Sequence, residues 1–202
     1  PKDLYMRVLL ICVPRTGSTS FLKALSKSLA IPYISIPDTY TYKENSSLIE
    51  STIKKKNIIF RMSPDHNVGY DLVKFSSFFD KVILLTRLDD EDHYKSIVNL
   101  YYREHILGYG TKGLYVYEDI PKSIIKDIEE TVNYNEILLA KQQILDLSLK
   151  LQQEVLSYED IYYSNKALIY LSSNFRMFNK EVYHYNLGLT KRQRITRKTT
   201  LI

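Results

Sequence analysis

An unbroken apolar run near the start of the chain ends in a short polar loop, and a helical pattern follows at once. The run is residues 8–13, and the loop is residues 14–20. A run of this kind is typical of a strand buried on both faces of a parallel sheet. At such a junction the loop directs backbone N–H groups to one point, and the helix adds the positive end of its dipole. With a cation and hydroxyl groups also present, the segment predicts a binding site for phosphate or sulfate.

We expect anion contacts along the whole loop: Pro14, Arg15, Thr16, Gly17, Ser18, Thr19 and Ser20. The loop differs from that of nucleoside triphosphatases, in which Gly, four residues and Gly precede Lys and Ser or Thr. Ser18 stands where that pattern has Lys, and Cys12 stands where it has the first Gly. The cation is instead Arg15, inside the loop. The alternative is an ordinary strand–turn–helix whose Ser or Thr caps the helix.

The bulk composition is that of a globular protein in a single domain, residues 1–202. No apolar run approaches the ~20 residues of a membrane helix, so we expect no membrane partner. The first residues do not resemble a signal peptide, because Lys2, Asp3 and Arg7 interrupt them, and we expect a cytoplasmic location. The single cysteine, Cys12, favours a reducing compartment. The net charge of +5 comes from a basic tail at about 190–202, because without its five bases the remaining 23 basic residues balance 23 acidic ones.

Apolar runs alternate with helical patterns along the chain, which predicts an α/β fold with a central, mainly parallel sheet flanked by helices. The end of the chain is expected to be irregular. We expect strands at residues 7–13, 31–36, 57–61, 81–86 and 154–158 and helices at 18–29, 68–79, 89–106, 121–153 and 160–175.

A second arginine follows the clearest of these strands, at the edge of the sheet where such folds bind ligands. Arg87 comes directly after residues 81–86, and Ser96 lies about two turns into the next helix. An arginine fork and a hydroxyl so placed can hold one phosphate between them. The alternative for Arg87 is a salt bridge to one of the nearby acidic residues, Asp89, Asp90 or Asp92.

Three segments resemble motifs of the sulfotransferase superfamily. Residues 13–19 resemble its 5′-phosphosulfate loop, residues 84–89 running on to Ser96 resemble its 3′-phosphate motif, and residues 155–161 resemble its Tyr-Glu-Asp-Leu segment. The closest similarity is to the bacterial carbohydrate branch, of the trehalose and nodulation-factor type. The chain departs from that branch at Leu88, where the branch has a second arginine.

The resemblance implies a P-loop-like sulfotransferase fold and a sulfotransferase activity. The donor would be 3′-phosphoadenosine 5′-phosphosulfate (PAPS), with the bisphosphate PAP as product, and the acceptor a small molecule or carbohydrate hydroxyl. No metal is implied. The loop would hold the 5′-phosphate and sulfate, with Arg15 stabilising the charge that develops during transfer. Arg87 and Ser96 would hold the 3′-phosphate, Tyr158 would lie near the adenine, and Arg197 and Lys198 of the tail would close over the donor.

The general base stays open. The resemblance implies His or Glu as the base. His66 follows the strand at 57–61, where cytosolic members of the superfamily have a catalytic His, and Asp38 follows the first βα unit, near where the carbohydrate branch has a catalytic Glu, so these two are the leading candidates. Asp65 and Glu44 are further candidates. His93, in contrast, is expected to be a solvated helix residue.

Two other functions compete with sulfuryl transfer. One is a P-loop nucleotide kinase-like enzyme, against which the missing lysine counts. The other is a non-catalytic nucleic-acid-binding module that uses the basic tail. We do not expect a nucleic-acid partner, because the body of the chain is neutral.

Overall fold

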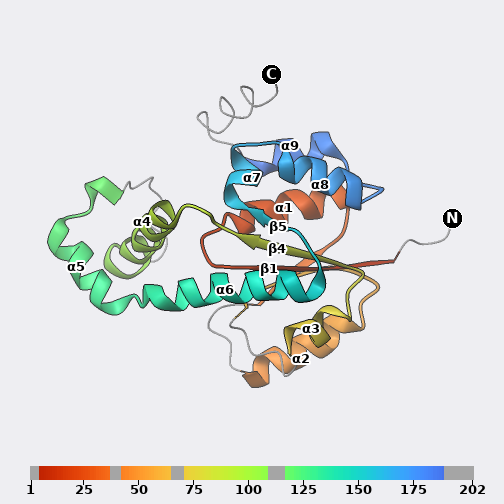
Figure 1. The fold of residues 1–202 in the computed structure, drawn as a ribbon, viewed down its shortest axis with the longest axis horizontal. Coiled ribbons are helices and arrows are strands. Elements are labelled where there is room, and N and C mark those ends of the chain that lie inside the picture. The colour runs from red at the N-terminus through yellow and green to blue at the C-terminus, as the bar shows by residue number, and fades with distance from the viewer. Residues whose placement is uncertain (1–4, 37–41, 65–70, 109–116, 189–202) are drawn as a thin grey trace.

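Five parallel strands form the central sheet, in the order β2-β3-β1-β4-β5 (Figure 1). The computed structural model describes residues 5–36, 42–64, 71–108 and 117–188, of which residues 42–46 are described by their backbone alone. The strands are β1 (Met6–Cys12), β2 (Tyr33–Ser35), β3 (Asn57–Met62), β4 (Lys81–Thr86) and β5 (Val155–Ser157). The predicted α/β class, with a parallel sheet flanked by helices, is confirmed.

Strand β1 occupies the middle of the sheet, paired with β3 on one side and with β4 on the other. The side chains of its apolar run are all fully buried and alternate between two cores. Val8, Leu10 and Cys12 belong to one core, and Leu9, Ile11 and Val13 belong to the other. Burial on both faces explains why the run contains no polar residue. It also fixes the following loop at the centre of the sheet's carboxyl edge.

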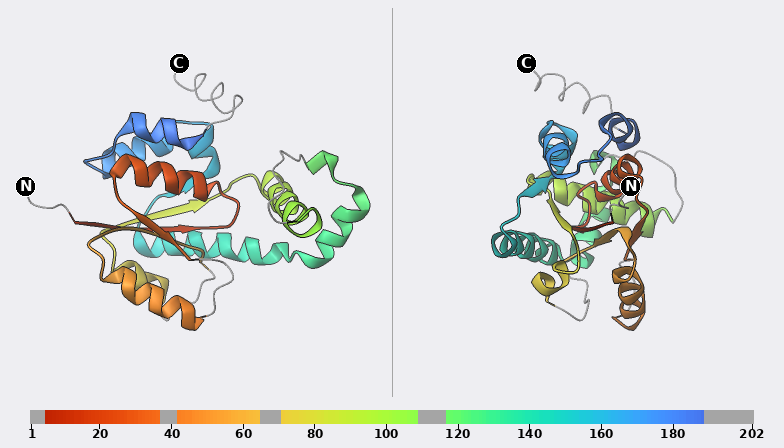
Figure 2. Two further views of the ribbon diagram at one scale, coloured as in Figure 1. Left: turned by 180° about the vertical axis from the view of Figure 1, so that it is seen from behind. Right: turned by 90° about the vertical axis from the view of Figure 1, so that its right-hand side faces the viewer.

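Helices cover both faces of the sheet, as the two views in Figure 2 show. One face carries α1 (Ser18–Leu29), α7 (Tyr158–Tyr162), α8 (Lys166–Asn174) and α9 (Lys180–Leu187). The other face carries α2 (Tyr42–Ile53), α3 (Leu72–Ser76) and α6 (Tyr134–Leu151). Each core therefore lies between the sheet and one layer of helices.

A smaller group of helices lies beyond one end of the sheet (Figure 1). It contains α4 (Asp90–Tyr101), the π-helix η1 (Tyr102–Ile106) that continues α4, the short 3-10 helix η2 (Tyr117–Asp119) and α5 (Lys122–Thr131). Val98, Ile120 and Ile128 form a third buried cluster that joins them. Because α4 starts just after β4, this group stands beside the loop that follows β1.

The strands agree with the prediction within two residues at each end, but several helices do not. The helix expected at 121–153 is two helices, because Val132 is extended (φ −87°, ψ 109°) between α5 and α6. The region 160–175 holds α7 and α8 as separate helices, and α3 is shorter than the helix expected at 68–79. Helix α2 was not predicted, and α9 occupies a stretch that was expected to be irregular.

Within the described ranges, no helix combines the length and the hydropathy that crossing a membrane requires. The single domain over residues 1–202 stays a prediction. The basic tail at 190–202 lies outside the described residues.

Candidate functional site

The loop after β1 is a tight turn with unusual backbone geometry. Arg15 and Gly17 both have positive φ, 61° and 70°. The buried Thr16 hydroxyl donates to the Val13 carbonyl (2.8 Å), which holds the turn from inside. A non-glycine residue with positive φ costs about 1–3 kcal/mol and is concentrated at functional sites. The strain at Arg15 is therefore consistent with a loop whose shape serves a ligand.

Helix α1 begins at the end of this loop without a side-chain cap, since its N-cap residue is Gly17. The alternative of a helix capped by Ser or Thr is thus wrong. Of the other helices, α3, α4, α7 and α9 are each capped by a side chain, from Asp71, Asp89, Ser157 and Asn179 respectively, whereas α5, α6 and α8 have no side-chain cap either. The uncapped first turn of α1 leaves N–H donors and the positive end of the helix dipole for a ligand.

Two predicted residues from distant parts of the chain meet at the loop. The Arg15 Nε donates to the Ser96 hydroxyl (3.1 Å), which joins the loop to α4. The sequence predicted that Ser96 and Arg87 hold one phosphate between them. In the structure the Ser96 hydroxyl instead accepts a hydrogen bond from Arg15. All three residues line the same pocket.

Arg87 is buried and incompletely satisfied. Its guanidinium lies over the ring of Tyr158, 4.3 Å from the centroid, and its Nη2 is 3.7 Å from an Asp92 oxygen. The alternative prediction for Arg87, a salt bridge to a nearby acidic residue, is therefore met by Asp92, although the contact is long. The Nε has no hydrogen-bond partner among the described residues, although the side chain is only 10% exposed. A buried donor without a partner is costly unless a ligand completes it.

These groups line one pocket of about 750 Å³ at the carboxyl edge of the sheet. Of the predicted residues it contains Pro14, Arg15, Gly17, Ser18, Thr19, Ser20, Arg87, Ser96 and Tyr158. Thr16 lies beneath the loop instead, where its hydroxyl is used internally. The structure thus brings the first loop, the strand end after β4 and the start of α7 together around one space.

Sequence reasoning missed four further side chains with polar groups that line this pocket: Arg61, Arg103, Glu104 and Tyr162. Arg61 is near the end of β3, the strand beside β1, and this position alone was a signal. Arg103 and Glu104 follow Ser96 by seven and eight residues, a spacing that returns to the same face of a helix. The signal for these two was therefore the helical period, once Ser96 had been singled out.

Like charges crowd the pocket. Burial lowers the pKa of Arg15, and the nearby cations Arg103 and Arg87 lower it further, whereas the Glu104 carboxylate acts in the opposite direction. Guanidinium groups this close repel one another, and that repulsion falls when an anion binds between them. The arrangement favours a ligand with more than one negative charge.

His93 fastens the loop from the side of α4. Its Nε2 is 2.7 Å from the Pro14 carbonyl, and the side chain is fully buried, so the expectation of a solvated helix residue is wrong. Burial lowers the pKa of His93 to about 4, so the ring is neutral near pH 7 and Nε2–H donates to the carbonyl. The Nδ1 has no partner among the described residues. His93 therefore positions the loop.

The predicted general bases cannot be located, because His66, Asp38 and Asp65 lie outside the described residues. Arg197 and Lys198 lie outside them as well. Glu44 belongs to α2, but its side chain is not described. In the described part of the chain, no group of three or more His, Cys, Asp or Glu side chains has the arrangement of a metal site.

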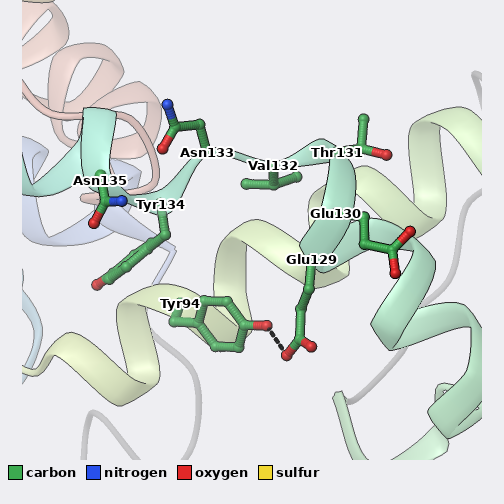
Figure 3. Close-up of a pocket in the computed structure, with 8 residues that line it drawn as sticks. All are labelled: Tyr94, Glu129, Glu130, Thr131, Val132, Asn133, Tyr134 and Asn135. Atoms are coloured by element: carbon green, nitrogen blue, oxygen red, sulfur yellow. Dashed lines mark hydrogen bonds between the residues drawn. The ribbon is translucent and has the colours of Figure 1, made fainter.

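A second pocket, of about 530 Å³, lies between α4 and the turn that joins α5 to α6 (Figure 3). Its ionisable lining includes Glu129 and Glu130 but no lysine or arginine. Figure 3 shows the Tyr94 hydroxyl directed at Glu129, to which it donates a hydrogen bond. Since carboxylates repel phosphate and sulfate, the loop pocket is the better anion site.

Comparisons with known proteins return only distant fold similarity. No family model and no curated protein matches the chain. Among solved structures, the chain is similar to a shikimate kinase from Bacteroides thetaiotaomicron, with 11% identity and a TM-score of 0.38 over 73% of this chain and 98% of that one. It is also similar to a gluconokinase from Sinorhizobium meliloti 1021, with 10% identity and a TM-score of 0.36 over 75% of this chain and 98% of that one.

The predicted membership of the sulfotransferase superfamily is wrong. No family model matches, and the two solved structures named above are kinases rather than sulfotransferases. The sulfotransferase activity and the donor PAPS, which rested on that resemblance, are wrong with it. The physical reason is that the motifs quoted are short and describe how a strand end holds an oxyanion, which unrelated proteins also do.

Proposed function

We propose that this chain is a nucleotide-dependent phosphotransferase. It binds a nucleoside triphosphate of the ATP class at the loop after β1 and transfers the terminal phosphoryl group to a small-molecule hydroxyl. The observation that carries the proposal is the concentration of positive charge at the uncapped start of α1, where Arg15, Arg87 and Arg103 interact electrostatically. Enzymes of phosphoryl transfer act mainly by positioning and by electrostatic stabilisation, and this site offers both.

The size and lining of the pocket support a nucleotide rather than a single small ion. A volume of about 750 Å³ is within the range of small-molecule sites. Tyr158 and Tyr162 line it beside Arg87, with ring centroids 4.5 Å apart. Because Arg87 and Tyr162 already pack against the Tyr158 ring, the arginines and the helix start, which suit phosphates, carry the recognition of the nucleotide.

Each part of the site has a role in this proposal. The first-turn N–H groups of α1 and the hydroxyls of residues 18–20 bind phosphate oxygens. Arg15 supplies, from within the loop, the positive charge that a lysine supplies in the common triphosphatase loop. Arg87 uses its unpartnered Nε for a second phosphate contact. A divalent cation would reach the site with the triphosphate, held mainly by phosphate oxygens and water.

The proposed location of the protein is the cytoplasm, because the free thiol of Cys12 suits a reducing compartment.

Isothermal titration calorimetry with ATP tests the proposal. The variant Arg15→Gly removes the guanidinium and keeps the positive φ without strain, because glycine adopts it freely. Losing one charge-assisted contact of about 1.5–3 kcal/mol weakens ATP binding about tenfold to a hundredfold. The matched control is Arg176→Ala, an exposed arginine outside the pocket, which leaves the affinity unchanged.

Adenosine, titrated in parallel, separates phosphate recognition from base stacking. The wild-type chain is expected to bind ATP much more tightly than adenosine. Equal affinity for the two, or no heat with ATP at all, contradicts the proposed function.

A further inference from the structure

Glu104 stands out in the loop pocket because of its charge. It is the only acidic side chain among the described residues that line the pocket, which also holds Arg15, Arg61, Arg87 and Arg103. Its side chain is 33% exposed, and its Oε1 is 3.4 Å from the Arg103 Nη2. A carboxylate in this place opposes the binding of anions. Its presence in a pocket otherwise suited to phosphates calls for a separate role.

The backbone around Glu104 is also unusual. Residues Tyr102–Ile106 form a π-helix directly after α4, and the Leu107 N–H donates to the Tyr102 carbonyl (3.0 Å), five residues earlier. The rings of Tyr101 and His105 stack across this turn with centroids 4.3 Å apart. Such wide turns are rare and frequently occur at functional sites. Here the turn carries both Arg103 and Glu104 at the pocket.

Glu104 lies close to the group that would stabilise the transferred phosphoryl. Its charge acts on Arg15, whose guanidinium also binds Ser96 on the same helix. The carboxylate is thus beside the phosphate loop, and it remains partly open to solvent. Glu104 is therefore both part of the pocket lining and accessible to a hydroxyl acceptor from solvent.

We propose that Glu104 is the catalytic residue that accepts the proton of the acceptor hydroxyl, an inference that rests on the proposed function. The acceptor oxygen forms a bond to the γ-phosphorus, and the bond from this phosphorus to the β,γ-bridging oxygen breaks, leaving ADP. The acceptor proton passes to the Glu104 carboxylate and then to water. A carboxylate has this role in the transfer step of protein kinases.

The test uses ATP hydrolysis, in which water takes the place of the acceptor. Glu104→Gln keeps the shape of the side chain and removes its charge. General-base catalysis contributes about a hundredfold to ten-thousandfold, so kcat is expected to fall at least a hundredfold. The KM for ATP and the affinity by calorimetry stay the same or improve, because a negative charge has left the pocket. The control is Glu91→Gln, which alters an exposed ion pair with Lys95 on α4 and leaves kcat unchanged.

The outcomes separate the two proposals. If the wild-type chain binds no ATP, the proposed function itself fails. If ATP binds equally well or better in Glu104→Gln and kcat stays within about twofold of wild type, Glu104 is merely a partner of Arg103 and this inference is overturned, while the proposed function stands. A wild-type protein that binds ATP but does not hydrolyse it also overturns the inference. Glu104 is open to solvent, so a general base at this position should activate water.

Discussion

At the scale of single residues, the site depends on groups that are held in costly states. Arg15 has a positive φ, and its guanidinium is close enough to Arg87 and Arg103 for their charges to lower its pKa. Arg87 has a buried donor with no partner among the described residues. An anion that binds here relieves the charge repulsion and gives the Arg87 donor a partner. Relief of these unfavourable interactions therefore contributes to the free energy of binding a negatively charged ligand.

The neutral state of His93 predicts an acid-sensitive fold. The pKa of its imidazole falls from 6.5 in the unfolded chain to about 4 in the folded protein, mainly because of burial. Between these two values the unfolded chain binds more protons, so stability is lost as the pH falls through this window. The loss attributable to this residue reaches about 3 kcal/mol, at about 1.4 kcal/mol for each unit of pKa shift.

Urea unfolding at a series of pH values measures this effect. The reference is His93→Gln, whose side-chain amide keeps a donor for the Pro14 carbonyl and does not titrate. The stability of the wild type is expected to fall more steeply than that of the variant from pH 6.5 to pH 4. Parallel curves for the two proteins would show that His93 does not titrate as a buried group.

At the scale of elements, α7 packs closely against the start of α1 through Tyr162 and Gly17. The Tyr162 hydroxyl donates to the Gly17 carbonyl (3.1 Å). A Cβ on Gly17 would lie 2.5 Å from the Tyr162 Cε2, well inside van der Waals contact. Two features therefore require glycine at position 17: the positive φ and the Tyr162 ring that lies against it.

Replacing Gly17 by alanine is expected to destabilise the fold more than the backbone alone explains. The left-handed conformation costs an alanine about 1–2 kcal/mol, and displacing Tyr162 also breaks a hydrogen bond of about 1 kcal/mol. Gly188→Ala is the matched control, since Gly188 has a φ of 63° and nothing within 4 Å of the added methyl. Unfolding free energies from urea titration should separate the two variants by at least about 1 kcal/mol. Equal losses would mean that the ring moves aside freely.

The elements that the sequence predicted well are those with a clear physical signal. The strands β1, β3 and β4 follow from apolar runs, because strands buried on both faces need such runs. Helix α2 escaped because it has little apolar periodicity, with Ile49 and Thr52 as its fully buried described residues. The break at Val132 escaped because helical spacing continues on both sides of it. Short helices and helix breaks depend on tertiary packing that the sequence does not display.

At the scale of the whole molecule, the parallel sheet assembles the site. Strand β1 carries the loop in the middle of the carboxyl edge, β3 brings Arg61 on one side, and β4 leads to Arg87 on the other. This convergence was predictable for the loop and Arg87, since ligands bind at this edge in open parallel sheets. The contribution of η1 was predictable only as far as the helical spacing from Ser96 to Arg103 and Glu104, because nothing in the sequence marks a π-helix after α4.

The wrong prediction of a sulfotransferase also has its cause at the scale of the whole molecule. The quoted motifs describe local anion binding, and the structure does bring them together around one pocket. Such motifs specify neither the group that is transferred nor the donor, which depend on contacts spread over several elements. The chemistry of the pocket is therefore a sounder guide than the similarity of short segments.

A crystal structure with a non-hydrolysable β,γ-imido analogue of ATP tests the central claim most directly. The account predicts that its phosphate oxygens lie about 3 Å from the first-turn N–H groups of α1 and from the guanidinium groups of Arg15 and Arg87. An analogue bound in the Tyr94 pocket or elsewhere, with the loop after β1 making no phosphate contact, would contradict it.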